Sequence, residues 1–162
     1  MTDSSGAAHT CDLREYILSR DLTRVTRKSY NWCFVATGVL HDPYTGKTIN
    51  FVRGVKTSTA VQIDHVVPLS NAWETGAQNL SVASRYSIAN DPLNLLAVDG
   101  PTNEAKGDSD AASYLPRPAY RCKYVARQLA VKRKYHLWVT SSEKTSMVAV
   151  LSACPGQKLP TN

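Results

Sequence analysis

The fold of this chain is decided by residues 60–69, which read AVQIDHVVPL. The apolar side chains of this run suit a buried strand, and Pro68 ends it because proline cannot donate to a strand ladder. Asp64 and His65 interrupt the run. An ionised carboxylate is costly to bury without a partner, so Asp64 requires a cation or several hydrogen bonds. A histidine on an apolar strand is more often an ordinary hydrogen-bonded core residue, so His65 taken alone is weak support for a function.

A second apolar stretch, residues 93–98, reads LNLLAV and carries one polar residue, Asn94. A turn then leads into a helix that we expect over residues 102–114, with Thr102 as its N-cap. Asn103 lies at the start of that helix. Two strands that each turn a polar side chain inward beside a helix start could bring oxygen donors around one cation. Oxygen ligands suit Mg²⁺, with Mn²⁺ as an alternative, better than they suit zinc.

Helices and a small hairpin are expected around this core. The apolar spacing and the turn residues favour the following elements. They are a helix over residues 11–22, strands at 33–40 and 47–52 joined by the turn 41–46, a helix broken at Gly76 over 70–90, a helix over 122–132, a strand at 135–139, and a last helix with Thr140 and Glu143 spaced as a capping box. We therefore expect a single α+β domain over residues 1–162, with a strand-strand-helix core at residues 61–114.

The four cysteines are Cys11, Cys33, Cys122 and Cys154, and none forms a Cys-x-x-Cys pair, which argues against a zinc ribbon or a thioredoxin-type site. Apolar residues follow Cys122 and precede Cys154 at helical spacing. If these are consecutive antiparallel helices, the start of the first meets the end of the second, which pairs Cys122 with Cys154 and leaves Cys11 for Cys33. Two disulfides would indicate an exported protein. Four buried free thiols are the alternative.

Composition and charge describe a globular protein with a basic surface. The net charge is +6 and the pI about 9.2, which suggests a polyanionic partner such as nucleic acid or an anionic cell surface. No apolar run approaches the roughly 20 residues of a membrane-spanning helix. The polar residues 1–10 lack the pattern of an export signal, so either the protein stays in the cytosol or a signal was removed before residue 1. Because the cysteines favour export, we expect a secreted monomer.

The polar residues of the core together resemble the HNH nuclease motif, in the variant whose last letter is asparagine. They are Asp64-His65-Val66-Val67-Pro68, then Asn94-Leu95-Leu96, then Asn103, Lys106 and Asp108. More closely, the chain resembles the small HNH family related to the C-terminal domain of the GmrSD restriction endonucleases, in particular its secreted actinobacterial members. An Asp-His pair is common by chance, but Asp-His-x-x-Pro followed by two asparagines in this order and a lysine is specific.

The resemblance implies a ββα-metal (His-Me finger) core and an endonuclease that hydrolyses DNA in the presence of a metal. His65 would be the general base that activates water, and Asn94 would orient the His65 ring. Asp64 and Asn103 would hold one divalent ion, which would stabilise charge on the departing 3′ oxygen. The expected products carry 5′-phosphate and 3′-hydroxyl ends. Gln62, which shares a strand face with Asp64, is a candidate supporting residue.

Phosphate contacts are expected from basic side chains, and Lys106 is the strongest candidate because it follows Asn103 by less than one helical turn. The other candidates are Arg85, Arg121, Lys123 and Arg127, whereas the run KRK at residues 132–134 is more typical of a solvated face. Because nothing resembles a recognition helix or a finger array, we expect little sequence specificity. Two other functions stay open: a nuclease that prefers RNA or a structured junction, and a non-catalytic module that binds nucleic acid or a cell surface.

Overall fold

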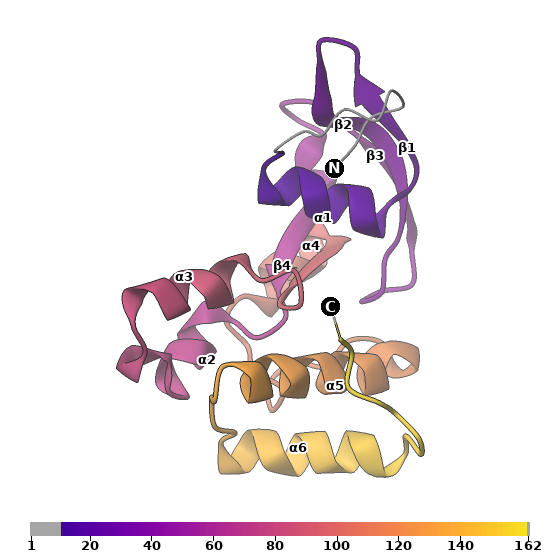
Figure 1. The fold of residues 1–162 in the computed structure, drawn as a ribbon. Coiled ribbons are helices and arrows are strands. Elements are labelled where there is room, and N and C mark those ends of the chain that lie inside the picture. Colours follow the sequence, from indigo (N-terminus) through magenta and orange to yellow (C-terminus); the bar gives the residue numbers. More distant parts are fainter. Residues whose placement is uncertain (1–10, 162) are drawn as a thin grey trace. The chain divides into compact units, whose positions relative to one another are not determined.

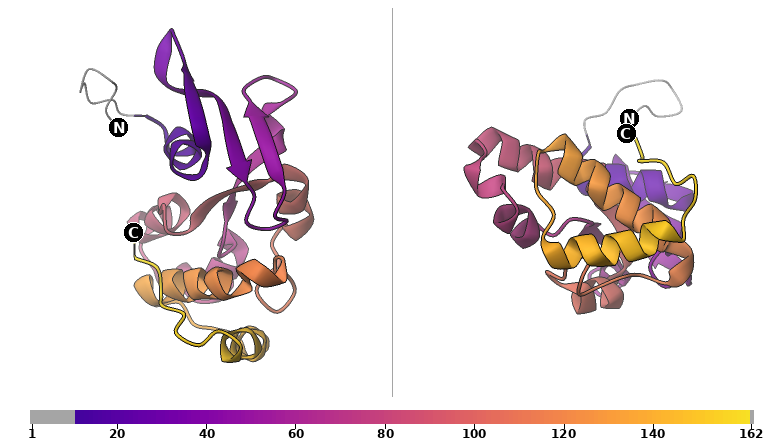
Figure 2. Two further views of the ribbon diagram at one scale, coloured as in Figure 1. Left: turned by 90° about the vertical axis from the view of Figure 1, so that its right-hand side faces the viewer. Right: turned by 90° about the horizontal axis from the view of Figure 1, so that it is seen from below.

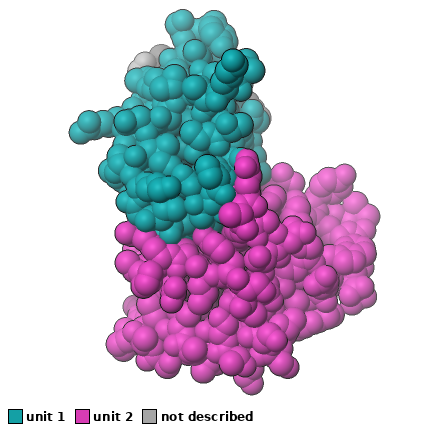
Figure 3. Space-filling view, turned by 180° about the vertical axis from the view of Figure 1, so that it is seen from behind, with its two compact units in different colours: residues 1–63, 97–103 teal, residues 64–96, 104–162 magenta. Residues whose placement is uncertain are grey.

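The computed structural model describes residues 11–161. Residues 1–10, whose polar sequence entered the argument about export, and Asn162 lie outside the described residues. In the described part of the chain, no helix has both the length and the apolar character to cross a membrane. Helices and strands both occur, which confirms the α+β class. The chain forms two compact units, residues 1–63 with 97–103 (unit 1) and residues 64–96 with 104–162 (unit 2) (Figure 3).

Unit 1 contains a three-stranded antiparallel sheet in the order β1-β2-β3 (Figure 1). Its elements are α1 (Leu13–Asp21), β1 (Thr23–Lys28), β2 (Asn31–His41), β3 (Thr48–Val52) and the short 3-10 turn η1 (Ser58–Ala60). The predicted reversal between β2 and β3 is present. The Asp42 carboxylate accepts a hydrogen bond from the Thr45 amide at 2.7 Å, and Gly46 has a φ of 81°, a conformation that glycine adopts without strain.

Helix α1 packs against the sheet through apolar side chains and one buried charge. Ile17 and Leu18 are fully buried. Glu15, on the same helix, is 1% exposed. Its carboxylate accepts a hydrogen bond from the Val35 amide of β2 at 2.8 Å and forms an ion pair with Arg53. The charge is therefore compensated where it is buried.

A second sheet joins β4 (Val61–His65) and β5 (Leu95–Asp99), and α4 (Gly100–Lys106) follows β5 directly. The boundaries between the two units fall inside these three elements. Helix α4 begins earlier than predicted, because the Asp99 carboxylate, and not Thr102, caps it: Asp99 accepts hydrogen bonds from the Thr102 amide at 3.0 Å and hydroxyl at 2.6 Å. Gly100 is required here, since a Cβ would lie 2.0 Å from the Thr59 carbonyl oxygen.

Unit 2 is largely helical. Its elements are α2 (Leu69–Glu74), the 3-10 turn η2 (Ala77–Asn79), α3 (Val82–Asn90), α5 (Pro118–Lys134) and α6 (Ser141–Ser152). The predicted break lies at Gly76, whose φ is 127°, and α6 begins with the predicted capping box of Thr140 and Glu143. The buried apolar cluster consists of Val67, Ala72, Ala77, Ile88, Leu93, Ala130, Val131 and Leu137.

Helices α5 and α6 lie side by side (Figures 1 and 2). Lys132 of α5 is 2% exposed, and its ammonium lies 2.8 Å from the Glu143 carboxylate of α6. Burial lowers the pKa of Lys132, and the hydrogen bond and charge of Glu143 oppose that shift. The run at residues 132–134 is thus not a uniformly solvated face, because Lys132 faces inward while Arg133 and Lys134 are exposed.

Both predicted disulfides are present. Cys122 and Cys154 join the start of α5 to the end of α6 with Cα atoms 5.9 Å apart, so the two helices run antiparallel. Cys11 and Cys33 join the start of α1 to β2 with Cα atoms 5.2 Å apart. The alternative of four free thiols is wrong.

Helix α4 also ends at Lys106 and not at residue 114 as predicted, and three other elements differ from the sequence prediction. Strand β1 is not predicted, because its sequence TRVTRK is largely polar and its conformation depends on backbone pairing with β2. Residues 135–139 form a loop and not a strand. The Leu137 and Trp138 amides donate to the Lys132 and Thr75 carbonyls, each at 2.9 Å, and need no neighbouring strand. Helix α5 starts at Pro118, earlier than expected, because proline is tolerated at the first helical position.

Candidate active site

The buried carboxylate of Asp64 has a cationic partner. The Asp64 side chain is 5% exposed, and the Lys106 Nζ, with a fully buried side chain, lies 2.8 Å from Oδ1. The same ammonium donates a hydrogen bond to the His65 backbone carbonyl at 3.1 Å. Lys106 thus supplies the charge compensation that the burial of Asp64 requires. Its ammonium points at Asp64, so the expectation of a surface contact between Lys106 and a phosphate does not fit this geometry.

The His65 ring is held by a hydrogen bond to the backbone. Its Nε2 lies 2.9 Å from the carbonyl oxygen of Ala89, near the end of α3. Because a carbonyl oxygen only accepts hydrogen bonds, Nε2 carries the hydrogen and donates. In the neutral ring the lone pair then belongs to Nδ1. His65 is partly exposed, so the residue is not sealed from solvent.

Asn94 ties together the two segments that set the position of this ring. It is fully buried. Its Oδ1 accepts a hydrogen bond from the Val67 amide at 2.8 Å, and its Nδ2 donates to the carbonyls of Val67 at 3.2 Å and Ile88 at 3.4 Å. Val67 lies two residues after His65, and Ile88 lies one residue before Ala89, the partner of the ring. The side-chain amide therefore fixes the backbone on both sides of the contact between His65 and Ala89.

Asp91 holds the turn that precedes Asn94. Its carboxylate accepts hydrogen bonds from the Leu93 amide at 2.9 Å and the Tyr135 hydroxyl at 2.8 Å, and lies 2.7 Å from the Lys134 ammonium. Burial acts to raise the pKa of Asp91, but the hydrogen bonds from Lys134 and Leu93 outweigh it, so the pKa lies below its ordinary value. Burial and the Asp91 carboxylate in turn raise the pKa of Tyr135.

Asn103 belongs to unit 1, where it contacts Gln62. The Asn103 Nδ2 donates to the Gln62 Oε1 at 2.9 Å. This hydrogen bond leaves the Asn103 Oδ1 as the amide oxygen that a cation could take. Of the residues that the motif singles out, unit 2 gathers Asp64, His65, Asn94 and Lys106, and unit 1 pairs Asn103 with Gln62.

The donor types fit a hard divalent ion that has few protein ligands. Within residues 11–161, no group of three or more Asp, Glu, His or Cys side chains forms a ready-made metal site. The carboxylate of Asp64 and the amide oxygen of Asn103 are oxygen donors, and Mg²⁺ commonly takes only one or two carboxylates and fills its shell with waters and phosphate oxygens. The pairing of Asp64 with an ammonium indicates that positive charge is stabilised at this carboxylate.

The other basic candidates for phosphate contacts are three partly exposed arginines and one exposed lysine. The guanidinium groups of Arg85, Arg121 and Arg127 are partly exposed and donate to backbone carbonyls at 2.9, 2.9 and 3.3 Å. Lys123 is exposed on α5. These contacts hold the three guanidinium groups in place, and their role at a nucleic acid stays a prediction.

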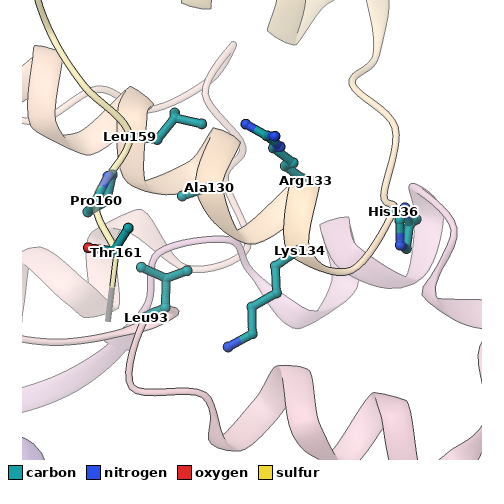
Figure 4. A pocket seen from close by; sticks show the side chains of 8 residues that line it. All are labelled: Leu93, Ala130, Arg133, Lys134, His136, Leu159, Pro160 and Thr161. Atoms are coloured by element: carbon teal, nitrogen blue, oxygen red, sulfur yellow. The ribbon is translucent and has the colours of Figure 1, made fainter.

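Unit 2 contains a cavity of about 500 Å³, and Figure 4 shows the residues that line it. Its walls include Arg133, Lys134 and His136, and residues 159–161 also line it. None of the motif residues is among the described residues that form its lining. Lys134 is the partner of Asp91. This cavity is therefore not evidence for the position of the active site.

Two contributors to the site are missed by sequence reasoning. Gln128 of α5 is 1% exposed and donates to the Val66 carbonyl at 2.8 Å, directly beside His65. The signal in the sequence is a glutamine on the apolar face of a predicted helix, which needs a hydrogen-bond partner when it is buried. Ala89 contributes its backbone carbonyl, and the identity of a residue gives no signal for a backbone contact.

Comparison with known proteins gives two matches that cover the whole site. The family described as the C-terminal domain of GmrSD restriction endonucleases matches residues 12–150. A protein of Arthroderma benhamiae, described as an uncharacterized secreted protein, is 40% identical over 148 residues, which make up 90% of this chain and 69% of that protein. The family match includes the residues from Asp64 to Lys106 and most of the chain. This chain therefore belongs to the family of GmrSD restriction endonuclease C-terminal domains.

Proposed function

We propose that this protein is a metal-dependent DNA endonuclease of the HNH type that hydrolyses phosphodiester bonds with low sequence specificity. Membership of the family already indicates a nuclease-related function. The observation that carries the proposal is the state of His65: Nε2 is occupied by the Ala89 carbonyl at 2.9 Å, which leaves Nδ1 as the proton acceptor. This base is adjacent in sequence to Asp64, a buried carboxylate.

In the proposed reaction, His65 acts as the general base. Its Nδ1 takes a proton from the water that attacks phosphorus. The hydrogen bond from Nε2 to Ala89 maintains the required tautomer and stabilises the ring when it becomes positively charged. Asn94, through Val67 and Ile88, holds the ring at the position where it meets that water. Asn94 is thus a positioning residue.

Asp64 and Asn103 are the proposed ligands of one divalent ion, with Mg²⁺ preferred and Mn²⁺ as an alternative. When bound, such an ion supplies Lewis-acid stabilisation of negative charge on the phosphate and on the departing 3′ oxygen. Lys106 orients the Asp64 carboxylate. Strands β4 and β5 and helix α4 would then form the ββα-metal core within residues 61–114, inside one nuclease domain that spans residues 1–162.

The proposed setting is outside the cell. The Arthroderma benhamiae relative is described as secreted, and the two disulfides suit an oxidising compartment. We further propose that the enzyme acts as a monomer, that it belongs to the actinobacterial type of the family, and that Arg85, Arg121, Lys123 and Arg127 neutralise phosphates.

A plasmid-nicking assay tests the proposal. Supercoiled DNA is incubated with the protein in Mg²⁺ or in EDTA, and with His65→Ala and His41→Ala, the latter an exposed histidine that serves as the matched control. The expected result is nicking only in Mg²⁺, retained by His41→Ala and lost by His65→Ala, with nicks that DNA ligase can seal. Binding without cleavage in every lane would support a non-catalytic module, and cleavage of RNA alone would support the RNA-preferring alternative.

A further inference from the structure

Helices α2 and α3 expose an unusual group of large apolar side chains beside the proposed site. Trp73 of α2 is 51% exposed and Tyr86 of α3 is 68% exposed. Leu69 and Val82, at the starts of the two helices, are 43% and 59% exposed. Single exposed apolar residues are normal, but a cluster of them on one surface marks a place where something binds.

Two neighbouring cavities open in this cluster. The first, of about 160 Å³, is lined by Trp73, Arg85 and Ala89 together with apolar side chains of α2, η2 and α3. The second, of about 310 Å³, is lined by Val82, Arg85, Tyr86 and Ala89. An apolar cavity of roughly 150 Å³ can hold a benzene-sized ring. The first cavity therefore has room for one aromatic ring, with a second aromatic side chain, Tyr86, beside it.

The charge of the cluster favours a nucleic acid over an apolar peptide. The Arg85 guanidinium lies 5.5 Å from the centre of the Trp73 ring, and its Nη1 donates to the Leu80 carbonyl at 2.9 Å. This arrangement holds a positive, planar group in the lining of both cavities, near the Trp73 ring. No acidic side chain is among the described residues that line either cavity. Aromatic rings combined with arginine are typical of single-strand binding surfaces.

The cluster is directly connected to the proposed general base. Ala89 lines both cavities, and its carbonyl oxygen accepts the hydrogen bond from His65 Nε2 at 2.9 Å. A ligand in either cavity would thus lie against Ala89, the residue whose carbonyl holds the His65 ring. All of these residues belong to unit 2.

We propose that Trp73, Tyr86 and Arg85 form a subsite that stacks an unpaired nucleobase, so that the enzyme prefers single-stranded DNA or DNA with unpaired nucleotides. A base inside a duplex is already stacked on both faces and would have to leave the helix to enter the pocket. Arg85 then contacts the ring or an adjacent phosphate. The proposal rests on the proposed nuclease function and specifies the form of its substrate.

The test is a binding measurement in EDTA, where no cleavage is required. Fluorescence anisotropy is recorded with a labelled single-stranded oligonucleotide, its blunt duplex, and a strand of the same length with abasic positions. The variants are Trp73→Ala and Tyr86→Ala. The matched control is Tyr30→Ala, which removes an aromatic side chain of unit 1 that is 75% exposed. Because Trp73 and Tyr86 are exposed, the variants should fold, which thermal melts verify.

The wild type should bind the single strand more tightly than the duplex or the abasic strand. Trp73→Ala and Tyr86→Ala should each raise the Kd for the single strand about tenfold and leave the Kd for the abasic strand unchanged. Equal affinity of wild type and both variants for the single strand would overturn the subsite and point to a protein partner for the cluster. If neither the plasmid nor the single-stranded oligonucleotide is cleaved in Mg²⁺ while Trp73-dependent binding is intact, the nuclease function is rejected and the subsite stands.

Discussion

Lys106→Met tests whether the charge of Asp64 is held in the interior by Lys106. The two side chains are 0% and 5% exposed and their charged atoms are 2.8 Å apart. Removing one partner of a buried ion pair leaves the other charge uncompensated, at a cost of roughly 3–5 kcal/mol. For a protein of this length 1 kcal/mol corresponds to about 2–4 °C, so we expect the melting temperature to fall by about 6–20 °C.

The assay is urea unfolding followed by tryptophan fluorescence, with the disulfides intact and EDTA present so that no divalent ion replaces the ammonium. Lys123→Met is the matched control, because Lys123 is an exposed lysine of unit 2, and should change the free energy of unfolding by less than about 0.5 kcal/mol. Adding Asp64→Asn to Lys106→Met should recover most of the loss, since no buried charge remains. A loss below about 1 kcal/mol for Lys106→Met, or no recovery in the double variant, would refute the reasoning.

Three further predictions concern the surroundings of the site. Asn94→Ala removes a fully buried amide and leaves its backbone partners unsatisfied, so the free energy of unfolding should fall by about 2–3 kcal/mol and nicking should be lost; a variant that keeps wild-type stability in urea would contradict this. Because the pKa of Asp91 is lowered in the folded protein, the unfolded chain binds more protons below about pH 4, and stability rises with pH there. Urea unfolding between pH 2 and 6 should therefore show a steeper loss of stability toward acid in the wild type than in Asp91→Asn, and parallel curves would reject a lowered pKa of Asp91. Cys122→Ser combined with Cys154→Ser should cost about 2–5 kcal/mol in the same urea assay, and an unchanged midpoint would show that the disulfide adds no stability.

Parts of the fold that depend on local pattern could be predicted from the sequence. The apolar spacing around Cys122 and Cys154 was sufficient to pair them, because two antiparallel helices joined by a short loop bring those ends together. The capping box at Thr140 and the break at Gly76 are also local. Strand β1 depends instead on a neighbouring strand, and its own side chains carry little signal.

In the candidate site too, some features follow from the local sequence and others depend on the fold. The sequence predicts that Asp64 requires a cation, because a carboxylate interrupts a buried strand. It does not reveal that Lys106 meets this need, since lysine is nearly always exposed and its burial follows from the path of α4. The Gln128 side chain donates a hydrogen bond to a backbone carbonyl, and Ala89 contributes its own backbone carbonyl to the His65 ring. Contacts of that kind follow from the fold and not from residue type.

The measurement closest to the central claim is imidazole rescue of His65→Ala in the plasmid-nicking assay. If the ring acts as the proton acceptor, the variant should nick DNA about 100-fold or more slowly than the wild type, and added imidazole should restore activity in proportion to its concentration without changing His41→Ala. A variant that nicks at the wild-type rate, or one whose lost activity imidazole leaves at zero while its fold and DNA binding are intact, would contradict the assignment.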